Sequence, residues 1–194
     1  MLLSPTKTTF YRAALALFAL SMSTASVAED KGAFFGKKAA GKWIIGGKVS
    51  NIDLNDSFVD DSSGAGIVLG YEFAKNVGTG KASFEIEYIA GEEENINSSN
   101  IGRYEVTQLN AFFTYRSAGN VFYKLKGGLE YSEIELSAGN FRQSDFGDLE
   151  EASLAGGIGI GYRFNEHGLI ELEYTKGSSD ADIATVSLNG LLTF

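Results

Sequence analysis

Few side chains in this sequence could carry out chemistry. His167 is the only histidine and cysteine is absent, so the chain offers neither a thiol nucleophile nor a Cys/His metal cluster. A histidine can act as a general base, but the asparagine, glutamate and glycine that surround this one in residues 165–168 are typical of a polar turn. We therefore predict no catalytic residue.

A glycine motif occurs at Gly157, Gly159 and Gly161, with a spacing close to that of phosphate-binding loops. A dinucleotide-binding fold also needs a helix directly after the motif and an acidic residue beyond it, and both are lacking here. We interpret these glycines as positions of close packing inside β-structure, and we predict no cofactor.

Three polar segments concentrate carboxylates, which are the ligands that calcium and magnesium prefer. Residues 53–57 are similar to the start of an EF-hand loop, but Phe58 stands where such a loop needs glycine. We expect solvated acidic loops and predict no metal site. The acidic residues are Asp53, Asp56, Asp60 and Asp61; Glu92, Glu93 and Glu94; and Asp145, Asp148, Glu150 and Glu151.

The start of the chain is typical of a secretory signal peptide. Lys7 and Arg12 supply a basic region, residues 13–20 form a short apolar core, and Ala28 ends a small-residue cleavage site. We predict that residues 1–28 are removed. Residues 29–194 then form a single domain.

The predicted mature chain is acidic and contains no proline. Residues 1–28 hold two basic residues, no acidic residue and the only proline, Pro5, so their removal changes the net charge from −9 to −11. A chain this acidic lacks the basic footprint that nucleic acid requires. The absence of proline suits fully paired strands, whose backbone N–H groups are all needed.

Alternation of apolar and polar residues recurs eight times, and each segment is about ten residues long, as a tilted transmembrane strand requires. Short turns and longer polar loops alternate between the segments, so an even number of strands places both termini at the turn end. No segment has the ~18 apolar residues of a transmembrane helix. The predicted strands are 42–51, 64–74, 82–91, 104–116, 121–132, 152–164, 168–176 and 183–194.

One face of these strands is apolar and the other polar. In a soluble barrel the apolar face would line the interior, whereas in a membrane barrel it would meet lipid. Aromatic residues near the strand ends favour the membrane barrel, because aromatic girdles mark both lipid interfaces. The predicted girdle comprises Trp43, Tyr71, Phe73, Tyr115, Tyr131, Tyr162, Phe164, Tyr174 and Phe194.

The polar face then lines a narrow lumen and carries five basic and six acidic residues. An unpaired buried charge costs several kcal/mol, so this near balance predicts a network of ion pairs that closes the barrel. A gated ion path is the alternative. The charged residues are Lys48, Glu72, Glu85, Glu87, Arg116, Lys124, Lys126, Glu130, Arg163, Glu171 and Glu173.

The chain ends within a strand, at Phe194, and such a strand must be held on both sides. We expect it to pair with the strand of Trp43 and Val49, which would close the barrel. With the signal peptide, the eight strands and the Gly-Tyr-x-Phe motifs at 70–73 and 161–164, the sequence resembles the small OmpA/OmpX-type outer-membrane β-barrels of Gram-negative bacteria.

The resemblance implies an eight-stranded antiparallel up-and-down transmembrane β-barrel in the bacterial outer membrane, with both termini periplasmic. It implies insertion by the outer-membrane assembly machinery and contact with outer-membrane lipids and lipopolysaccharide. We expect a structural or surface-interaction role without catalysis, with the acidic loops facing a host or cell-surface ligand or divalent cations. A narrow channel for small solutes or ions is the alternative, and an outer-leaflet lipid-modifying enzyme is a remote one.

Overall fold

The computed structural model describes residues 41–53, 61–95, 102–138, 149–178 and 183–194, so the predicted signal peptide lies outside the described residues. Every regular element of the described residues is a strand. The strands are β1 Lys42–Asp53, β2 Ser62–Val77, β3 Gly80–Gly91, β4 Glu94–Asn95, β5 Gly102–Arg116, β6 Val121–Ala138, β7 Leu149–Arg163, β8 Gly168–Gly177 and β9 Ala184–Thr193.

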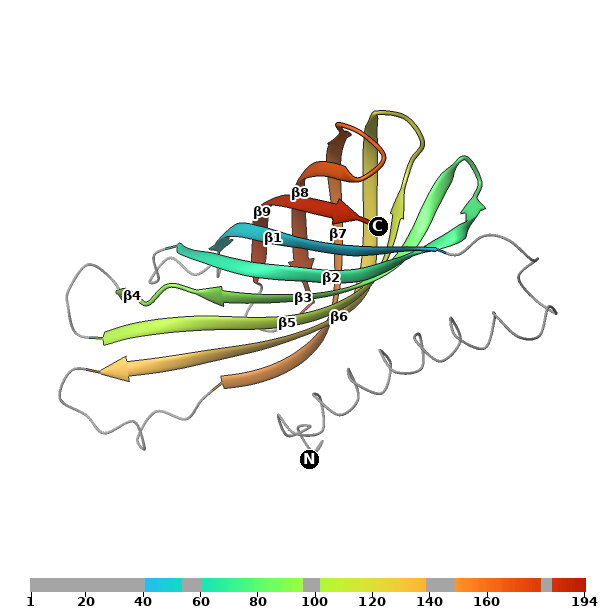
Figure 1. Cartoon of the computed structure of the whole chain (residues 1–194). Helices are drawn as coiled ribbons and strands as arrows, with labels where there is room; N and C mark the ends of the chain where they lie inside the picture. Colours follow the sequence, from blue (N-terminus) through green and yellow to red (C-terminus); the bar gives the residue numbers. More distant parts are fainter. Residues whose placement is uncertain (1–40, 54–60, 96–101, 139–148, 179–182) are drawn as a thin grey trace.

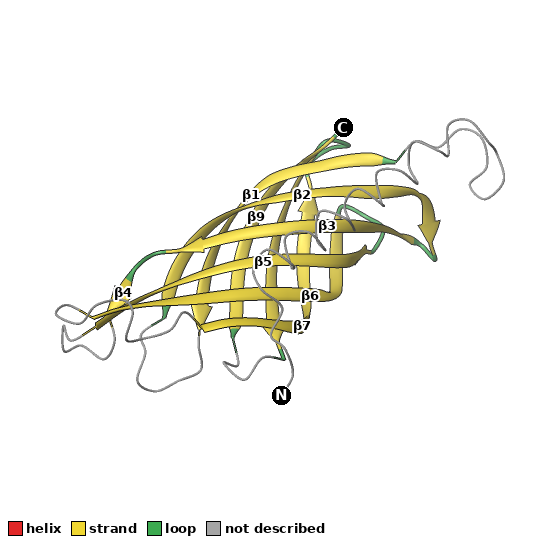
Figure 2. Ribbon diagram, turned by 90° about the horizontal axis from the view of Figure 1, so that it is seen from below, coloured by secondary structure: helices red, strands yellow, loops and turns green. Residues whose placement is uncertain are grey.

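Eight long strands form a closed antiparallel barrel, as predicted (Figures 1 and 2). Each is hydrogen-bonded to its neighbour in the chain, β3 pairs with β5, and the two-residue β4 lies beside β5. The predicted closure is confirmed because β1 pairs with β9, with Val49 opposite Leu188. Trp43 and Phe194 exchange two backbone hydrogen bonds of 2.8 and 3.1 Å, so the final residue is held by the first strand.

All of the long strands except β9 are longer than the alternation predicted; β9 is Ala184–Thr193, two residues shorter than the predicted 183–194. The segment 75–81, expected to be a turn, is mostly strand, because Asn76 pairs with Lys81 and Val77 with Gly80. The turn itself is Gly78-Thr79, and Gly78 has a φ of 60°, which glycine adopts without strain. At the other end β6 continues to Ala138, where it pairs with Gly102. The hydrogen-bonded ladders therefore extend into segments whose polar composition indicated loops.

The two ends of the barrel differ. The short turns after β2, β5 and β7 lie at one end, which we call the turn end, together with the C-terminus (Figure 1). Thr193 N donates to His167 O over 2.8 Å, which fixes the last strand to the β7–β8 turn. At the opposite end, here called the loop end, β1, β6 and β8 end and β2, β7 and β9 begin.

The apolar face of the barrel points outward. Val121, Leu154 and Phe113 are 73, 67 and 65% exposed, whereas Glu85, Glu87 and Glu171 are fully buried. This arrangement is the reverse of a soluble barrel with an apolar interior. It decides between the two orientations that alternation alone leaves open.

No helix among the described residues is long and apolar enough to cross a lipid bilayer.

The interior is layered. Near the turn end lies a buried apolar cluster, the turn-side layer, formed by Ile44, Val68, Phe122, Leu169 and Leu191. Near the loop end lies a second buried cluster, the loop-side layer, formed by Ile52, Ile89, Tyr104, Val106, Ile134 and Ile183. Most of the buried charged side chains occupy the space between these two apolar layers.

Candidate functional site

The candidate site is a network of eight buried charges in the middle of the lumen, which we call the ion network. Four are cationic and four anionic, so the network is neutral when all are ionised. Each of these side chains is at most 1% exposed. Its members are Lys48, Arg116, Lys124 and Lys126, and Glu85, Glu87, Glu171 and Glu173.

Glu173 on β8 is the most connected carboxylate of the network. Lys124 Nζ donates to its Oε2 over 2.7 Å and Lys126 Nζ to its Oε1 over 2.9 Å, while Lys48 Nζ also donates to Oε1. Glu87 on β3 is shared by Lys126 at 3.0 and 3.1 Å and Lys48 at 2.5 Å. Side chains from β1, β3, β6 and β8 therefore meet across the lumen.

Arg116 on β5 connects two further carboxylates. Its Nε donates to Glu171 Oε1 and its Nη1 to Glu85 Oε1, both over 2.5 Å, and Nη1 also donates to Ser83 Oγ over 2.9 Å. Lys124 lies between the two carboxylates, 2.8 Å from Glu171 and 3.3 Å from Glu85. Planar guanidinium groups that bond carboxylates through several N–H groups form the strong class of charge-assisted hydrogen bonds. Arg116 therefore connects β5 to β3 and to β8 across the lumen.

Glycines on two strands provide the room for these long side chains. A Cβ added to Gly157 on β7 would lie 3.0 Å from Lys126 Cε, and one on Gly159 would lie 3.1 Å from Glu173 Cβ. On β2, a Cβ at Gly70 would lie 2.8 Å from Glu85 Cγ. The Gly-x-Gly-x-Gly motif therefore forms part of the wall of the lumen. The strands β2 and β7 lie on opposite sides of the barrel, separated by β3, β5 and β6.

Three charges predicted for the lumen lie outside the ion network. Glu72 and Arg163 line the turn-end mouth instead. Glu130 is 2% exposed and pairs in register with Asn110 and Ser153, on the loop side of the network. None of the three forms an ion pair among the described residues, so the predicted lumen set divides into a paired core and unpaired flanks.

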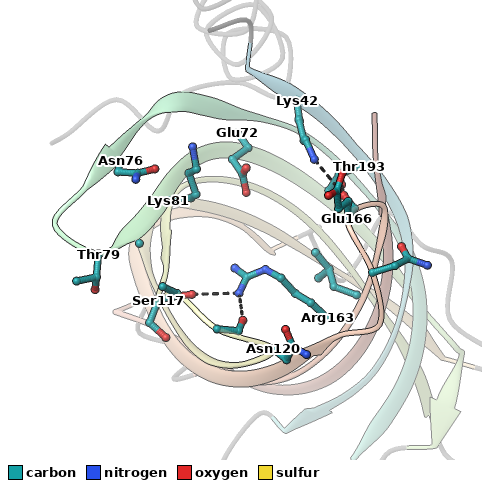
Figure 3. A pocket seen from close by; sticks show the side chains of 15 residues that line it. Lys42, Glu72, Asn76, Thr79, Lys81, Ser117, Asn120, Arg163, Glu166 and Thr193 are labelled. Carbon is teal, nitrogen blue, oxygen red and sulfur yellow. Dashed lines mark hydrogen bonds between the residues drawn. The ribbon is translucent and has the colours of Figure 1, made fainter.

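The turn-end mouth is a cavity of about 420 Å³, here called the vestibule (Figure 3). Arg163 projects into it, with Nη1 donating to Ser117 O over 3.1 Å and Gly119 O over 2.5 Å. The guanidinium carbon stands 4.1 Å from the centre of the Phe122 ring. Phe122 belongs to the turn-side layer, so that layer forms the floor of the vestibule.

The predicted girdle residues are distributed unevenly. At the turn end, the rings of Trp43 and Tyr71 pack edge-on with centroids 5.1 Å apart, and those of Tyr162 and Phe164 do so at 5.3 Å. Tyr131 shares the outward parity of Leu129, but the residue is only 3% exposed, so its neighbours cover it. The remaining members are Phe73 and Tyr115, which are partly exposed, and Tyr174 and Phe194, which are exposed.

His167 lies in the exposed β7–β8 turn. Its Nδ1 is 2.9 Å from the backbone oxygen of Thr193, so it contacts a carbonyl of the last strand. The described residues contain no group of three or more His, Cys, Asp or Glu side chains able to hold a metal. Of the first acidic segment, Asp56 and Asp60 lie outside the described residues.

The two apolar layers are what sequence reasoning missed. The signal was a local break of alternation, in which an apolar residue occupies an inward position. Ile44 between Trp43 and Ile45 is one instance, and Phe122 between Val121 and Tyr123 is another. Such three-residue apolar runs at strand ends indicate that the polar face has become apolar.

Comparison with known proteins agrees with this geometry. The family model for the outer membrane protein beta-barrel domain matches residues 13–191. No curated protein sequence matches the chain.

Several solved structures share the fold. OprG of Pseudomonas aeruginosa is 15% identical with a TM-score of 0.59, over 80% of this chain and 97% of OprG. Ail, the attachment invasion locus protein of Yersinia pestis, is 15% identical with a TM-score of 0.53, over 79% and 97% of the two chains. Neisserial surface protein A is 12% identical with a TM-score of 0.51, over 79% and 95%. The match to the family model covers most of the sequence, and the chain therefore belongs to the outer membrane protein β-barrel domain family, whose place is the bacterial outer membrane.

Proposed function

We propose that this protein is a non-conducting, non-enzymatic barrel of the outer membrane with a structural or surface-interaction role. The ion network carries this proposal. Eight paired charges fill the middle of the lumen, and an apolar layer lies on each side of them. An ion entering the lumen would have to cross both apolar layers and displace carboxylates or ammonium groups already held by short hydrogen bonds.

The orientation is part of the proposal. We infer that the turn end faces the periplasm and the loop end faces outward, because short turns are periplasmic and longer loops extracellular in barrels of this kind. Both termini are then periplasmic. The assembly machinery would meet the final strand there, and the acidic loops would face lipopolysaccharide or a host surface. The structural similarity to Ail, an attachment invasion locus protein, is consistent with a surface role.

Single-channel recording in planar bilayers tests closure. The folded protein is expected to give no steady conductance steps, while a large porin added to the same bilayer serves as the positive control. The protein's fold is verified beforehand by heat-modifiable gel migration. Steady steps of picosiemens or more from properly folded protein would establish the second candidate, a narrow channel, which the open vestibule favours.

The surface role has a separate test. Calcium is expected to strengthen adhesion of the detergent-folded protein to vesicles that contain lipopolysaccharide. Vesicles of phospholipid alone are the comparison. The physical reason is that a divalent cation can bridge loop carboxylates and lipid phosphates. Equal adhesion to both vesicles, with and without calcium, would contradict it.

A further inference from the structure

The charges of the vestibule are arranged differently from those of the ion network. Three cations line it, and each is held by backbone oxygens: Lys42 Nζ donates to Glu166 O over 3.1 Å, Lys81 Nζ donates to Ala74 O over 2.7 Å, and Arg163 donates to the β5–β6 turn. In the part of the chain that the structure describes, none of the three forms an ion pair. These cations are positioned but not neutralised.

Arg163 has hydrogen-bonding capacity to spare. Both of its intramolecular hydrogen bonds come from Nη1, which fixes one corner of the guanidinium, and the Phe122 ring supports one face at 4.1 Å. Nε and Nη2 have no partner among the described residues, and the group projects into the open mouth (Figure 3). A guanidinium edge with two free N–H groups matches the two oxygens of a phosphate or carboxylate.

A carboxylate on the other side of the vestibule limits what can bind. The side chain of Glu72 points into the mouth across from Arg163 (Figure 3), and Glu166 also lines the rim. A fully deprotonated anion would be attracted by three cations and repelled by two carboxylates. An anion that also carries an O–H group can donate it to Glu72 while its other oxygens accept from Arg163.

Hydrogen phosphate has this combination of groups, and the cavity of about 420 Å³ is large enough for it. We propose that the vestibule binds a hydrogen phosphate-type anion. Arg163 is the bidentate donor, Lys42 and Lys81 are flanking cations, and the carboxylate of Glu72 accepts a hydrogen bond from the O–H group of the anion. The turn-side layer beneath Arg163 closes the inner end of the site. The vestibule is then a blind binding site, whose occupation does not require passage through the barrel.

Arginine side-chain NMR on the detergent-folded barrel is the direct test. The Nε–H resonance of Arg163 is expected to shift on titration with inorganic phosphate, while that of Arg116, enclosed in the ion network, stays in place. Sodium chloride at equal ionic strength is the control for screening. An Arg163 resonance that moves no further with phosphate than with chloride would overturn the proposal.

Two comparisons sharpen the result. Sulfate, a tetrahedral anion that has no O–H donor at neutral pH, is expected to bind more weakly than phosphate, and equal or tighter sulfate binding would overturn the role of Glu72. Arg163→Lys keeps the positive charge but loses the paired N–H donors of the guanidinium group, so it should weaken phosphate binding about ten-fold or more. Arg103→Lys, at the exposed loop end, is the matched control, and equal phosphate affinity in the two variants would contradict the site.

Discussion

Replacing Glu173 by glutamine should destabilise the barrel strongly. Glu173 accepts from three ammonium groups, two at Oε1 and one at Oε2. Glutamine keeps the shape, but its NH₂ group must face at least one of these ammonium groups in either orientation. The ion network would change from four cations and four anions to four and three, leaving a buried net charge of +1.

The magnitude follows from the burial of the contacts. Removing one partner of a buried ion pair costs about 3–5 kcal/mol, and each lysine retains another carboxylate, so we expect the lower part of that range. Glu93→Gln is the matched control, because it breaks the pair between Glu93 and Arg103, whose side chains are 47 and 62% exposed at 3.4 Å. An exposed pair contributes about 0–1 kcal/mol.

Urea unfolding in phospholipid vesicles measures both changes. Trp43 is the only tryptophan and lies at the β1–β9 closure, so its fluorescence reports loss of the barrel. The double variant Glu173→Gln, Lys126→Met restores three cations and three anions, and it should be more stable than the sum of the single changes predicts. The ion network does not act as a neutral unit if the stability losses of Glu173→Gln and Glu93→Gln differ by less than about 1 kcal/mol. It also does not do so if the stability loss of the double variant equals the sum of the two single losses.

Two further predictions concern the wall. Cysteines at Val49 and Leu188 should form a disulfide on oxidation of the folded barrel, since directly opposed residues of antiparallel strands have Cα atoms about 4.5–5.5 Å apart. Cysteines at Val49 and Leu172 should not, because Leu172 lies two strands away from Val49. Equal disulfide yields for the two pairs, measured on gels, would refute the β1–β9 closure. Gly161→Val should cost about 1–3 kcal/mol in urea unfolding because its Cβ would lie 2.2 Å from Phe122 Cζ. Gly127→Val, where nothing lies within 4 Å, should be close to neutral, and equal costs would contradict the assigned packing.

The strands could be predicted because each carries its own signal. Alternation over ten residues identifies a strand without reference to the rest of the chain. The pairing of β9 with β1 was also predictable, since closing the sheet leaves each of these two strands as the other's only available neighbour. Local patterns and closure together determine the topology.

The contacts of the ion network could not be predicted in the same way. Lys48 and Glu173 are 125 residues apart in the sequence. They meet because of the stagger between strands and the width of the lumen, and no single segment of the sequence determines either of these properties. The sequence indicated which residues face inward. It did not indicate that Glu130 and Arg163 remain outside the network, because parity assigns a face and not a height.

Height in the barrel separates the eight charges of the ion network from Arg163. The paired charges lie between two apolar layers, where the low dielectric strengthens each hydrogen bond and makes any unpaired charge costly. Arg163 lies beyond the turn-side layer, where water and solutes reach it, so it remains unpaired at little cost. A charged side chain that can remain unpaired at a small free-energy cost is available to bind a ligand. The same inward face can therefore hold the barrel together in its middle and bind an anion at its mouth, without a path between the two.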